Sequence, residues 1–262
     1  MKNSYLLEPA KVIKAIKESP TAVTLFFKME NQKNFGFLAG QFMQISLPGF
    51  GECPISISSN PKDAGRHFSL TIRGAGDLTR RLNKLQRGDT TFVRGPFGNG
   101  FPEVTGNLVL ISGGCGLAPL RSVYLENKNK KNVKIQIFHG CRDASQIVFH
   151  DEFDSICENC DFNVILEKDK LPGYSDQTGF VTNLIKNKKL LPDAKIFMCG
   201  PEAMYKNVVK ELIAKGVKPE DIYVSLENRM HCGVGVCQHC ACKTKYVCKD
   251  GPVFNYAKLC ET

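Results

Sequence analysis

The chain has 262 residues, of which 42% are hydrophobic and 23% charged, as in a soluble globular protein of roughly two domains. No apolar run approaches the ~18 residues of a membrane-spanning helix, and the first twenty residues lack the pattern of a signal peptide. The net charge of +9 comes from dispersed lysines, without basic runs interleaved with aromatic residues, which argues against nucleic acid as a partner. We therefore expect a cytoplasmic protein without a membrane span, in which cysteines serve metal or redox chemistry more readily than disulfides.

The first hundred residues predict an antiparallel β structure. Short runs of β-branched and aromatic residues alternate with Gly, Pro and Asn at about ten-residue intervals, which is typical of a barrel or sandwich. These runs occupy residues 22–29, 40–49, 54–61, 68–74 and 88–100. We expect a β-barrel domain over residues 1–103.

After Pro102 the pattern changes to continuous apolar strands that alternate with helix-like segments. Strands of this kind predict an α/β domain with a parallel sheet covered on both faces, and they lie at residues 107–114, 133–140, 162–168 and 194–200. A helix from residue 202 to Gly216 is expected to bury a stripe formed by Met204, Val208, Leu212 and Ile213. We place this domain at residues 104–226 and a small cysteine lobe at residues 227–262.

The cysteine lobe has the spacing of an iron–sulfur site. Four cysteines follow the pattern C-x4-C-x2-C-x7-C, namely Cys232, Cys237, Cys240 and Cys248. The first three reproduce the spacing of plant-type 2Fe–2S ferredoxins. Gly233 and Gly235 allow the intervening loop to wrap closely round a cluster. Residues 246–248 are expected to form a short strand that brings in the fourth thiolate.

A structural zinc site is the alternative for this lobe, with thiolates alone or with His231 or His239 as ligands. Zinc knuckles favour paired C-x2-C units, and the lobe holds one such unit. Cys242 is a spare thiol that we expect to pack beside the site. These spacings favour a 2Fe–2S cluster.

Three glycine-containing turns predict phosphate binding. Gly113, Gly114 and Gly116 join a strand to a helix opened by Pro119, and Cys199, Gly200 and Pro201 follow another strand of the same sheet. Nucleotides bind beyond the carboxyl ends of such strands, at helix N-termini. In the barrel, Arg73, Gly74, Gly76 and Thr79 form a weaker candidate for an anion site.

These features together imply a flavin. A nicotinamide transfers two electrons as hydride, whereas an iron–sulfur cluster accepts one at a time, and a flavin can do both. The motifs GQFMQISLP, PISIS, GDLT, RGPFGNGFP, SGGCGLAP and MCGPEAM, followed by the cysteine lobe, resemble the ferredoxin–NADP reductase superfamily. They are most similar to its iron–sulfur branch, which includes the corresponding subunit of anaerobic sulfite reductase, the gamma subunits of NiFe sulfhydrogenases and the electron-transfer subunit of dihydroorotate dehydrogenase.

The resemblance implies FAD, NAD(P)H and a 2Fe–2S cluster, and it assigns residues to each nucleotide. Pro54, Ile55 and Ser56 would line the isoalloxazine, and Gly76, Leu78 and Thr79 would hold the FAD pyrophosphate. The nicotinamide nucleotide would be bordered by Gly114, Gly116, Pro119, Cys199, Gly200 and Pro201. The wider superfamily has an Arg-x-Tyr-Ser/Thr motif where this chain has Cys53-Pro54-Ile55-Ser56. Arg73 and Arg80 are candidates for the missing charge, and FMN remains an alternative to FAD.

The expected function is electron transfer between NAD(P)H, FAD and the cluster, to or from a catalytic partner subunit of the sulfite reductase or hydrogenase type. No acid–base or nucleophilic catalytic residue is required, because the cofactors carry the chemistry. Alternatives are a dihydroorotate dehydrogenase subunit, a regulatory module that keeps the cluster without nucleotide turnover, and a reductase with a small-molecule acceptor. Glu167 and Lys168 should lie near the ribose 2′ position, where the acidic residue favours NADH over NADPH.

Overall fold

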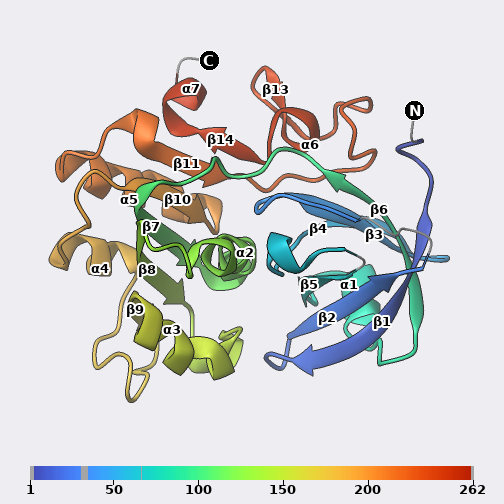
Figure 1. Ribbon diagram of the computed structural model, residues 1–262, viewed down its shortest axis with the longest axis horizontal. Helices are drawn as coiled ribbons and strands as arrows, with labels where there is room; N and C mark the ends of the chain where they lie inside the picture. Colours follow the sequence, from blue (N-terminus) through green and yellow to red (C-terminus); the bar gives the residue numbers. More distant parts are fainter. Residues whose placement is uncertain (1–2, 31–34, 66, 261–262) are drawn as a thin grey trace.

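The computed structural model describes residues 3–30, 35–65 and 67–260. It contains two six-stranded sheets side by side, with the C-terminal lobe lying across the same edge of both (Figure 1). The N-terminal sheet has the order β4-β3-β6-β1-β2-β5 and is antiparallel throughout. Its elements are β1 (Glu8–Lys17), β2 (Ala22–Met29), β3 (Phe42–Leu47), β4 (Gly51–Ser56), β5 (His67–Arg73), α1 (Asp77–Leu82) and β6 (Thr90–Phe97).

A bridge between Ile57, just after β4, and Leu70 in β5 joins the two edges of this sheet. The sheet is thereby curved into a barrel, as the sequence predicted. Its interior is filled by the inward side chains of every strand, among them Val12, Leu25, Ile45 and Val93, each at most 1% exposed. The barrel is therefore a packed core, and its outer surface carries the candidate sites.

The second sheet has the order β14-β11-β10-β7-β8-β9, and its five strands other than β14 are parallel. The elements before the lobe are β7 (Gly106–Gly113), α2 (Leu117–Asn127), β8 (Val133–Cys141), α3 (Phe153–Asn159), β9 (Asp161–Leu166), α4 (Val181–Asn187), β10 (Lys195–Cys199), α5 (Glu202–Ala214) and β11 (Ile222–Ser225). Short 3-10 helices lie at η1 (Pro61–Asp63), η2 (Gly114–Gly116), η3 (Ala144–Gln146), η4 (His150–Glu152) and η5 (Pro219–Asp221).

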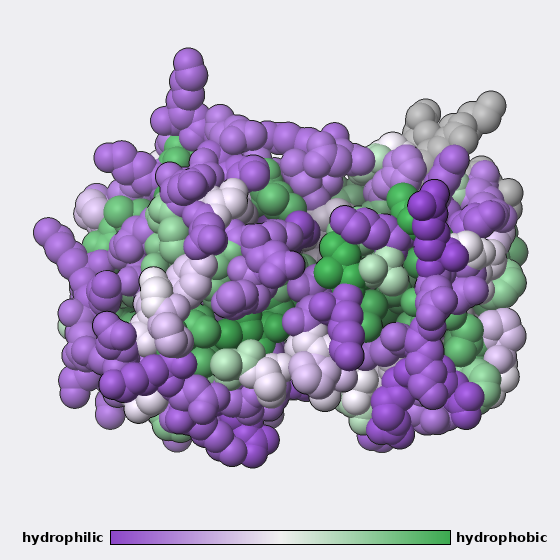
Figure 2. Space-filling model, turned by 90° about the horizontal axis from the view of Figure 1, so that it is seen from below, coloured by the Kyte–Doolittle hydropathy of each residue, from purple (hydrophilic) through white to green (hydrophobic). Residues whose placement is uncertain are grey.

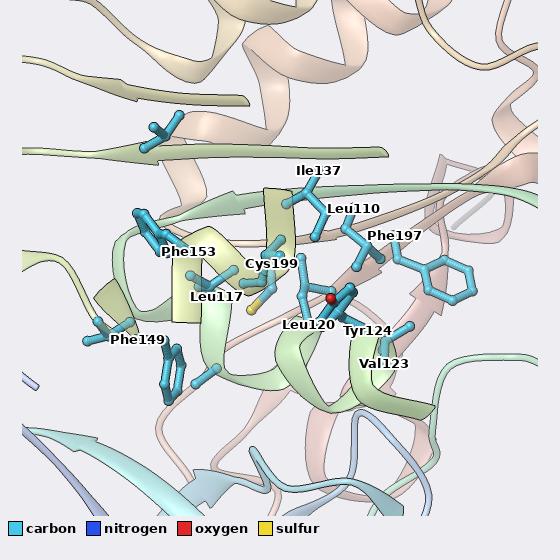
Figure 3. Close-up of a cluster of buried hydrophobic side chains, with 14 of the residues drawn as sticks. Leu110, Leu117, Leu120, Val123, Tyr124, Ile137, Phe149, Phe153, Phe197 and Cys199 are labelled. Atoms are coloured by element: carbon cyan, nitrogen blue, oxygen red, sulfur yellow. The ribbon is translucent and has the colours of Figure 1, made fainter. Parts of the chain in front are cut away.

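Helices cover both faces of the parallel sheet. On one face, α2 packs Leu117, Leu120 and Val123 against side chains of β7, β8 and β10 (Figure 3). On the other face, α4 and α5 bury apolar residues that include Val181, Ile185, Val208 and Leu212. The face seen in Figure 2 is largely hydrophilic at its rim, and apolar residues gather toward its middle.

Two sequence predictions about local structure were wrong. In α5 the buried stripe runs through Val208, Val209 and Leu212, whereas Ile213 is 43% exposed, because one further residue turns the side chain past the face that meets the sheet. In the lobe, the expected strand stops at Tyr246 and a helical turn begins at Val247. The Asp250 carboxylate accepts a hydrogen bond of 2.7 Å from the backbone N–H of Tyr246, and this bond stabilises the turn.

The C-terminal lobe is attached to both halves of the molecule. Its elements are β12 (Ala241–Cys242), β13 (Lys245–Tyr246), α6 (Val247–Asp250), β14 (Val253–Asn255) and α7 (Tyr256–Cys260). Strand β14 pairs with β11 and so extends the parallel sheet with an antiparallel edge.

None of the helices in the described parts of the chain is long and apolar enough to span a membrane.

Candidate cofactor sites

A cavity of about 540 Å³ lies beyond the carboxyl ends of the parallel strands. The turns after β7, β8, β9 and β10 all contribute to its wall, which includes Gly114, Cys115, Arg142, Glu167 and Pro201. In an open parallel sheet this is the position at which nucleotides bind. The N-termini of α2 and α5 lie at the same edge, where backbone N–H groups favour an anion. The cavity fits a dinucleotide phosphate group.

The residues that the sequence assigned to the nicotinamide nucleotide fall into two groups, those on the cavity wall and those behind it. Gly114, Glu167 and Pro201 line the cavity, while Gly116, Cys199 and Gly200 are absent from its wall.

These three residues shape the turns behind the wall. A Cβ on Gly116 would lie 2.2 Å from the Cys199 carbonyl oxygen, so the two strand–helix turns meet backbone to backbone. The Gly200 N–H donates to the Tyr205 hydroxyl at 3.1 Å, and that hydroxyl donates to the Ser225 carbonyl at 2.6 Å. The N–H of Gly200 is therefore already engaged within the protein.

Two further residues of this cavity were missed from the sequence. Arg142 follows β8 and supplies a cation on the same wall as Glu167. Phe180 lines the cavity and is 60% exposed, which is unusual for a large aromatic side chain and suits a stacking surface. The signal available in the sequence was Gly179, which turns the chain just ahead of α4 with a φ of 147°.

A second cavity, of about 290 Å³, lies between the barrel, α2 and the cysteine lobe. It collects most of the residues assigned to the flavin and also Pro119, which was assigned to the nicotinamide nucleotide. Those on its wall are Pro54, Ile55, Ser56, Arg73, Thr79 and Pro119. Arg80, the other candidate for a phosphate cation, is absent from the wall.

Gly76 and Leu78 support the flavin cavity from behind. Leu78 packs against the barrel core, and the Gly76 N–H donates to the Thr79 hydroxyl at 2.8 Å. The hydroxyl in turn lies 3.1 Å from the Gly76 carbonyl. Thr79 thus fixes the turn before α1 as well as facing the cavity.

The cysteine lobe forms part of the flavin cavity through Glu227, Asn228, Met230 and Pro252. Glu227 was not identified from the sequence. Burial raises the pKa of its carboxyl group, and the Arg73 guanidinium opposes that shift. A carboxyl group with a raised pKa in a cleft is a candidate functional group. Its position after β11 also brings the cavity within a few residues of Cys232.

Backbone N–H groups of the cysteine loop point at the predicted ligand sulfurs. The Cys232 sulfur accepts from the N–H groups of Val234, Val236 and Cys237 at 3.3–3.4 Å. Although burial acts to raise its pKa, these hydrogen bonds lower the pKa of Cys232 to about 6. The loop therefore stabilises a thiolate, the form that ligates iron.

The remaining predicted ligand cysteines lie in the same network. The Cys248 sulfur accepts the Gly235 N–H at 3.1 Å, and the Cys240 sulfur accepts the Cys248 N–H at 3.4 Å. A Cβ on Gly235 would lie 2.7 Å from the Lys249 side chain, so the loop needs glycine there. Three of the four predicted ligand sulfurs thus accept backbone N–H groups, and hydrogen bonds to sulfur fit an iron–sulfur cluster.

The zinc alternative involves the same four cysteines, alone or together with His231 or His239. Within residues 3–30, 35–65 and 67–260, no three His, Cys, Asp or Glu side chains converge closely enough to hold a single metal ion. His231 and His239 contact each other, with ring centroids 4.0 Å apart. Cys242 is half-buried and packs against the core beneath the lobe.

Comparison with known proteins agrees with this geometry. Residues 9–101 match the oxidoreductase FAD-binding domain, residues 110–210 the oxidoreductase NAD-binding domain, and residues 227–260 the iron–sulfur cluster binding domain of dihydroorotate dehydrogenase B. The gamma subunit of sulfhydrogenase 1 from Pyrococcus furiosus is 39% identical, over 99% of this chain and 94% of that protein. The chain belongs to this family of iron–sulfur flavoprotein subunits.

Other relatives of this chain include subunits of two kinds of enzyme complex and a solved structure. The gamma subunit of sulfhydrogenase 2 from Pyrococcus furiosus is 38% identical over 97% of this chain and 96% of its own length. A probable dihydroorotate dehydrogenase B electron transfer subunit from Thermoplasma volcanium is 32% identical over 95% of this chain and 89% of its own length. Among solved structures, the NADH-dependent reduced ferredoxin–NADP oxidoreductase matches with a TM-score of 0.78 and 25% identity, over 100% of this chain and 94% of that one. The chain is thus an oxidoreductase subunit with FAD-binding, NAD-binding and iron–sulfur domains.

Proposed function

We propose that this protein is the electron-transfer subunit of a complex and passes electrons between NAD(P)H, FAD and a 2Fe–2S cluster, to or from a catalytic redox subunit of the hydrogenase or sulfite reductase type. The observation that carries this proposal is the continuity of the two cavities and the cysteine loop. Arg73 and Cys115 line both cavities, and Met230 lines the flavin cavity two residues before Cys232.

Bound flavin would exchange hydride with a nicotinamide and single electrons with the cluster. The residues of this chain position the groups and exclude water. Cys115 and Arg73 form the shared wall across which the two ring systems would meet. Met230 and Pro252 line the flavin cavity on the side of the cysteine lobe. The four cysteines Cys232, Cys237, Cys240 and Cys248 would hold the irons.

In this proposal residues 1–103 bind FAD, residues 104–226 bind NAD(P)H and residues 227–262 bind the cluster. Strand β14 links the last two domains. We place the protein in the cytoplasm, where the thiolates that ligate a cluster remain reduced.

The nucleotide preference that we propose is NADH, with Glu167 as the discriminating residue. Glu167 lies on the nucleotide cavity directly after β9, and its backbone N–H donates to the Cys141 carbonyl at 3.0 Å. A carboxylate at the ribose 2′ position accepts a hydrogen bond from the 2′-hydroxyl of NADH and repels the 2′-phosphate of NADPH. Arg142 on the same wall acts in the opposite direction, so the preference is expected to be moderate.

A dihydroorotate dehydrogenase subunit is the second candidate, and the match of residues 227–260 to the cluster domain of that enzyme favours it. Purification of the native complex under anaerobic conditions separates the two. Our proposal expects hydrogenase or sulfite reductase subunits and hydrogen- or sulfite-linked NAD(P)H turnover. Copurification with a flavin-containing dihydroorotate dehydrogenase, and orotate-linked turnover, would support the second candidate. A flavin band that NADH and NADPH fail to bleach would indicate the regulatory module.

A further inference from the structure

A partly buried ion pair of the barrel, with Glu52 28% exposed, holds the backbone of the cysteine loop. Arg94 in β6 is 6% exposed, and its Nε donates to the Glu52 carboxylate at 2.7 Å. The same guanidinium donates to the carbonyl of Cys232 at 2.6 Å and to that of His231 at 3.2 Å. It also reaches the Ser4 carbonyl at 3.4 Å. A flavin-domain side chain thereby fixes the peptide of the first predicted ligand.

Gln44 lies beside Arg94 and reaches the same loop. It pairs across the sheet with Arg94 in β6 and with Pro54 in β4, and cross-strand partners share one face. Its side chain is fully buried, and within the described structure its amide nitrogen and oxygen have no hydrogen-bond partner. A Cβ on Gly233 would lie 3.1 Å from the Gln44 amide nitrogen. An unpaired buried amide is costly, so a partner absent from the polypeptide is expected here.

The loop that follows β6 completes the contact between barrel and lobe. The Asn99 N–H donates to the Gly251 carbonyl at 2.6 Å, and the Asn99 side chain donates to the Asp250 carbonyl at 3.0 Å. A Cβ on Gly98 would lie 2.5 Å from the Pro252 ring. Both ends of the ligand-bearing segment, around Cys232 and just after Cys248, are therefore fixed on the barrel.

We propose that Arg94, held by Glu52, is a positioning residue for the cluster, and that Gln44 donates its amide N–H to a sulfur at the Cys232 corner of the bound cluster. This inference rests on the proposed function, because it takes an iron–sulfur cluster as the group in the lobe. Arg94 fixes the first ligand relative to Pro54 of the flavin cavity. The Gln44 donor stabilises the additional negative charge of the reduced cluster and raises its midpoint potential.

Gln44→Met tests the donor with little change in side-chain volume. We expect parental iron, sulfide and flavin content, a more negative midpoint potential in a mediated redox titration, and altered g values of the reduced cluster in electron paramagnetic resonance. A variant with parental content but an unchanged potential and spectrum would overturn the assignment of Gln44. The titration uses chemical reductant, so it gives this result even if NAD(P)H proves not to be the electron donor.

Arg94→Met and Arg94→Lys test the positioning role. Arg94→Met should lower cluster retention under a chelator about tenfold, as expected for loss of one charged hydrogen bond, and should accelerate hydrogen exchange of Val234, Val236 and Cys237. Arg94→Lys should recover part of both. The matched control is Arg81→Met, which removes an exposed pair with Asp77 at 3.2 Å and should leave both readouts parental. Parental retention and exchange in both Arg94 variants would overturn the positioning role.

Discussion

Arg73 and Cys115 lie on one partition between the nucleotide cavity and the flavin cavity. Arg73 ends β5 of the barrel, and Cys115 lies in the turn η2 after β7. Burial raises the pKa of the Cys115 thiol, and the nearby Arg73 guanidinium opposes the shift. The Cys115 thiol is thus a neutral group in the shared wall, while the Arg73 guanidinium places a positive charge beside both cavities.

Replacement of Arg73 should therefore weaken flavin binding. Arg73→Ala removes a charged contact, and we expect a loss of about 1–3 kcal/mol in FAD binding. Thr79→Ala should also weaken retention, because the Thr79 hydroxyl holds the Gly76 turn. Flavin release measured by ultrafiltration checks both. Arg80→Ala is the control, since Arg80 is an exposed neighbour outside the cavity wall; equal retention in all four proteins would place the flavin phosphates elsewhere.

The cluster prediction concerns individual cysteines. Serine in place of Cys232, Cys237, Cys240 or Cys248 should abolish or strongly perturb the 2Fe–2S spectrum, because oxygen is a poor ligand for iron–sulfur clusters compared with thiolate. Cys242→Ser is the matched control and should retain the spectrum. Iron, sulfide and zinc analysis of anaerobically purified protein provides the measurement. Stoichiometric zinc without iron or sulfide would refute the assignment.

The nucleotide prediction concerns Glu167. Glu167→Ser should move the preference from NADH toward NADPH, because it removes a charge that repels a 2′-phosphate. The ratio of flavin-reduction rates with each nucleotide measures the effect. Asp176→Ser makes the same change of charge at an exposed position outside the cavity wall and should leave the ratio unaltered. A parental preference for NADPH, or an unchanged ratio in the Glu167 variant, would show that Glu167 does not discriminate between the nucleotides.

A buried histidine makes stability depend on pH. His139 is fully buried, hydrogen-bonded to Ser112 at 2.8 Å, and burial lowers its pKa from 6.5 to about 4. The unfolded chain therefore binds a proton that the folded protein excludes between these values. The contribution of neutral His139 to the free energy of unfolding is fully present above pH 6.5. This contribution falls by up to about 3 kcal/mol as the pH decreases toward 4.

Chemical unfolding at neutral and at mildly acidic pH checks this prediction. His139→Gln cannot titrate and should lose less stability on acidification than the parent, even if it is less stable at neutral pH. An equal loss in both proteins would show that other groups control the acid sensitivity.

Periodicity and turn residues were sufficient to predict the main architecture. Alternating runs predicted the barrel, and continuous apolar strands predicted the parallel sheet, because each pattern reflects which faces are buried. The cysteine spacing predicted an iron–sulfur lobe, which the match of residues 227–260 to a cluster-binding domain supports, while the four ligands themselves stay a prediction. Ile213 and the turn at Val247 were predicted wrongly because neighbouring elements, rather than local pattern, decide which residue is buried and where a short strand stops.

The site residues that the sequence did not reveal depend on contacts between distant segments. Glu227 joins the flavin cavity because the segment after β11 shares that wall with barrel residues, and Arg142 joins the nucleotide cavity through the register of the parallel strands. Arg94 contacts Cys232, 138 positions away in sequence. A single sequence gives no local signal for such a pair, whose function follows from the fold.

Anaerobic stopped-flow reduction by NADH, followed at flavin and cluster wavelengths and by rapid-freeze electron paramagnetic resonance, tests the central claim most directly. The order of the cavities predicts that the flavin band bleaches first and that the cluster signal follows. Cys232→Ser should keep flavin reduction and lose the cluster phase, while Arg73→Ala with bound flavin should slow the first step. Reduction of the cluster ahead of the flavin, or by NADH in flavin-free protein, would contradict the account.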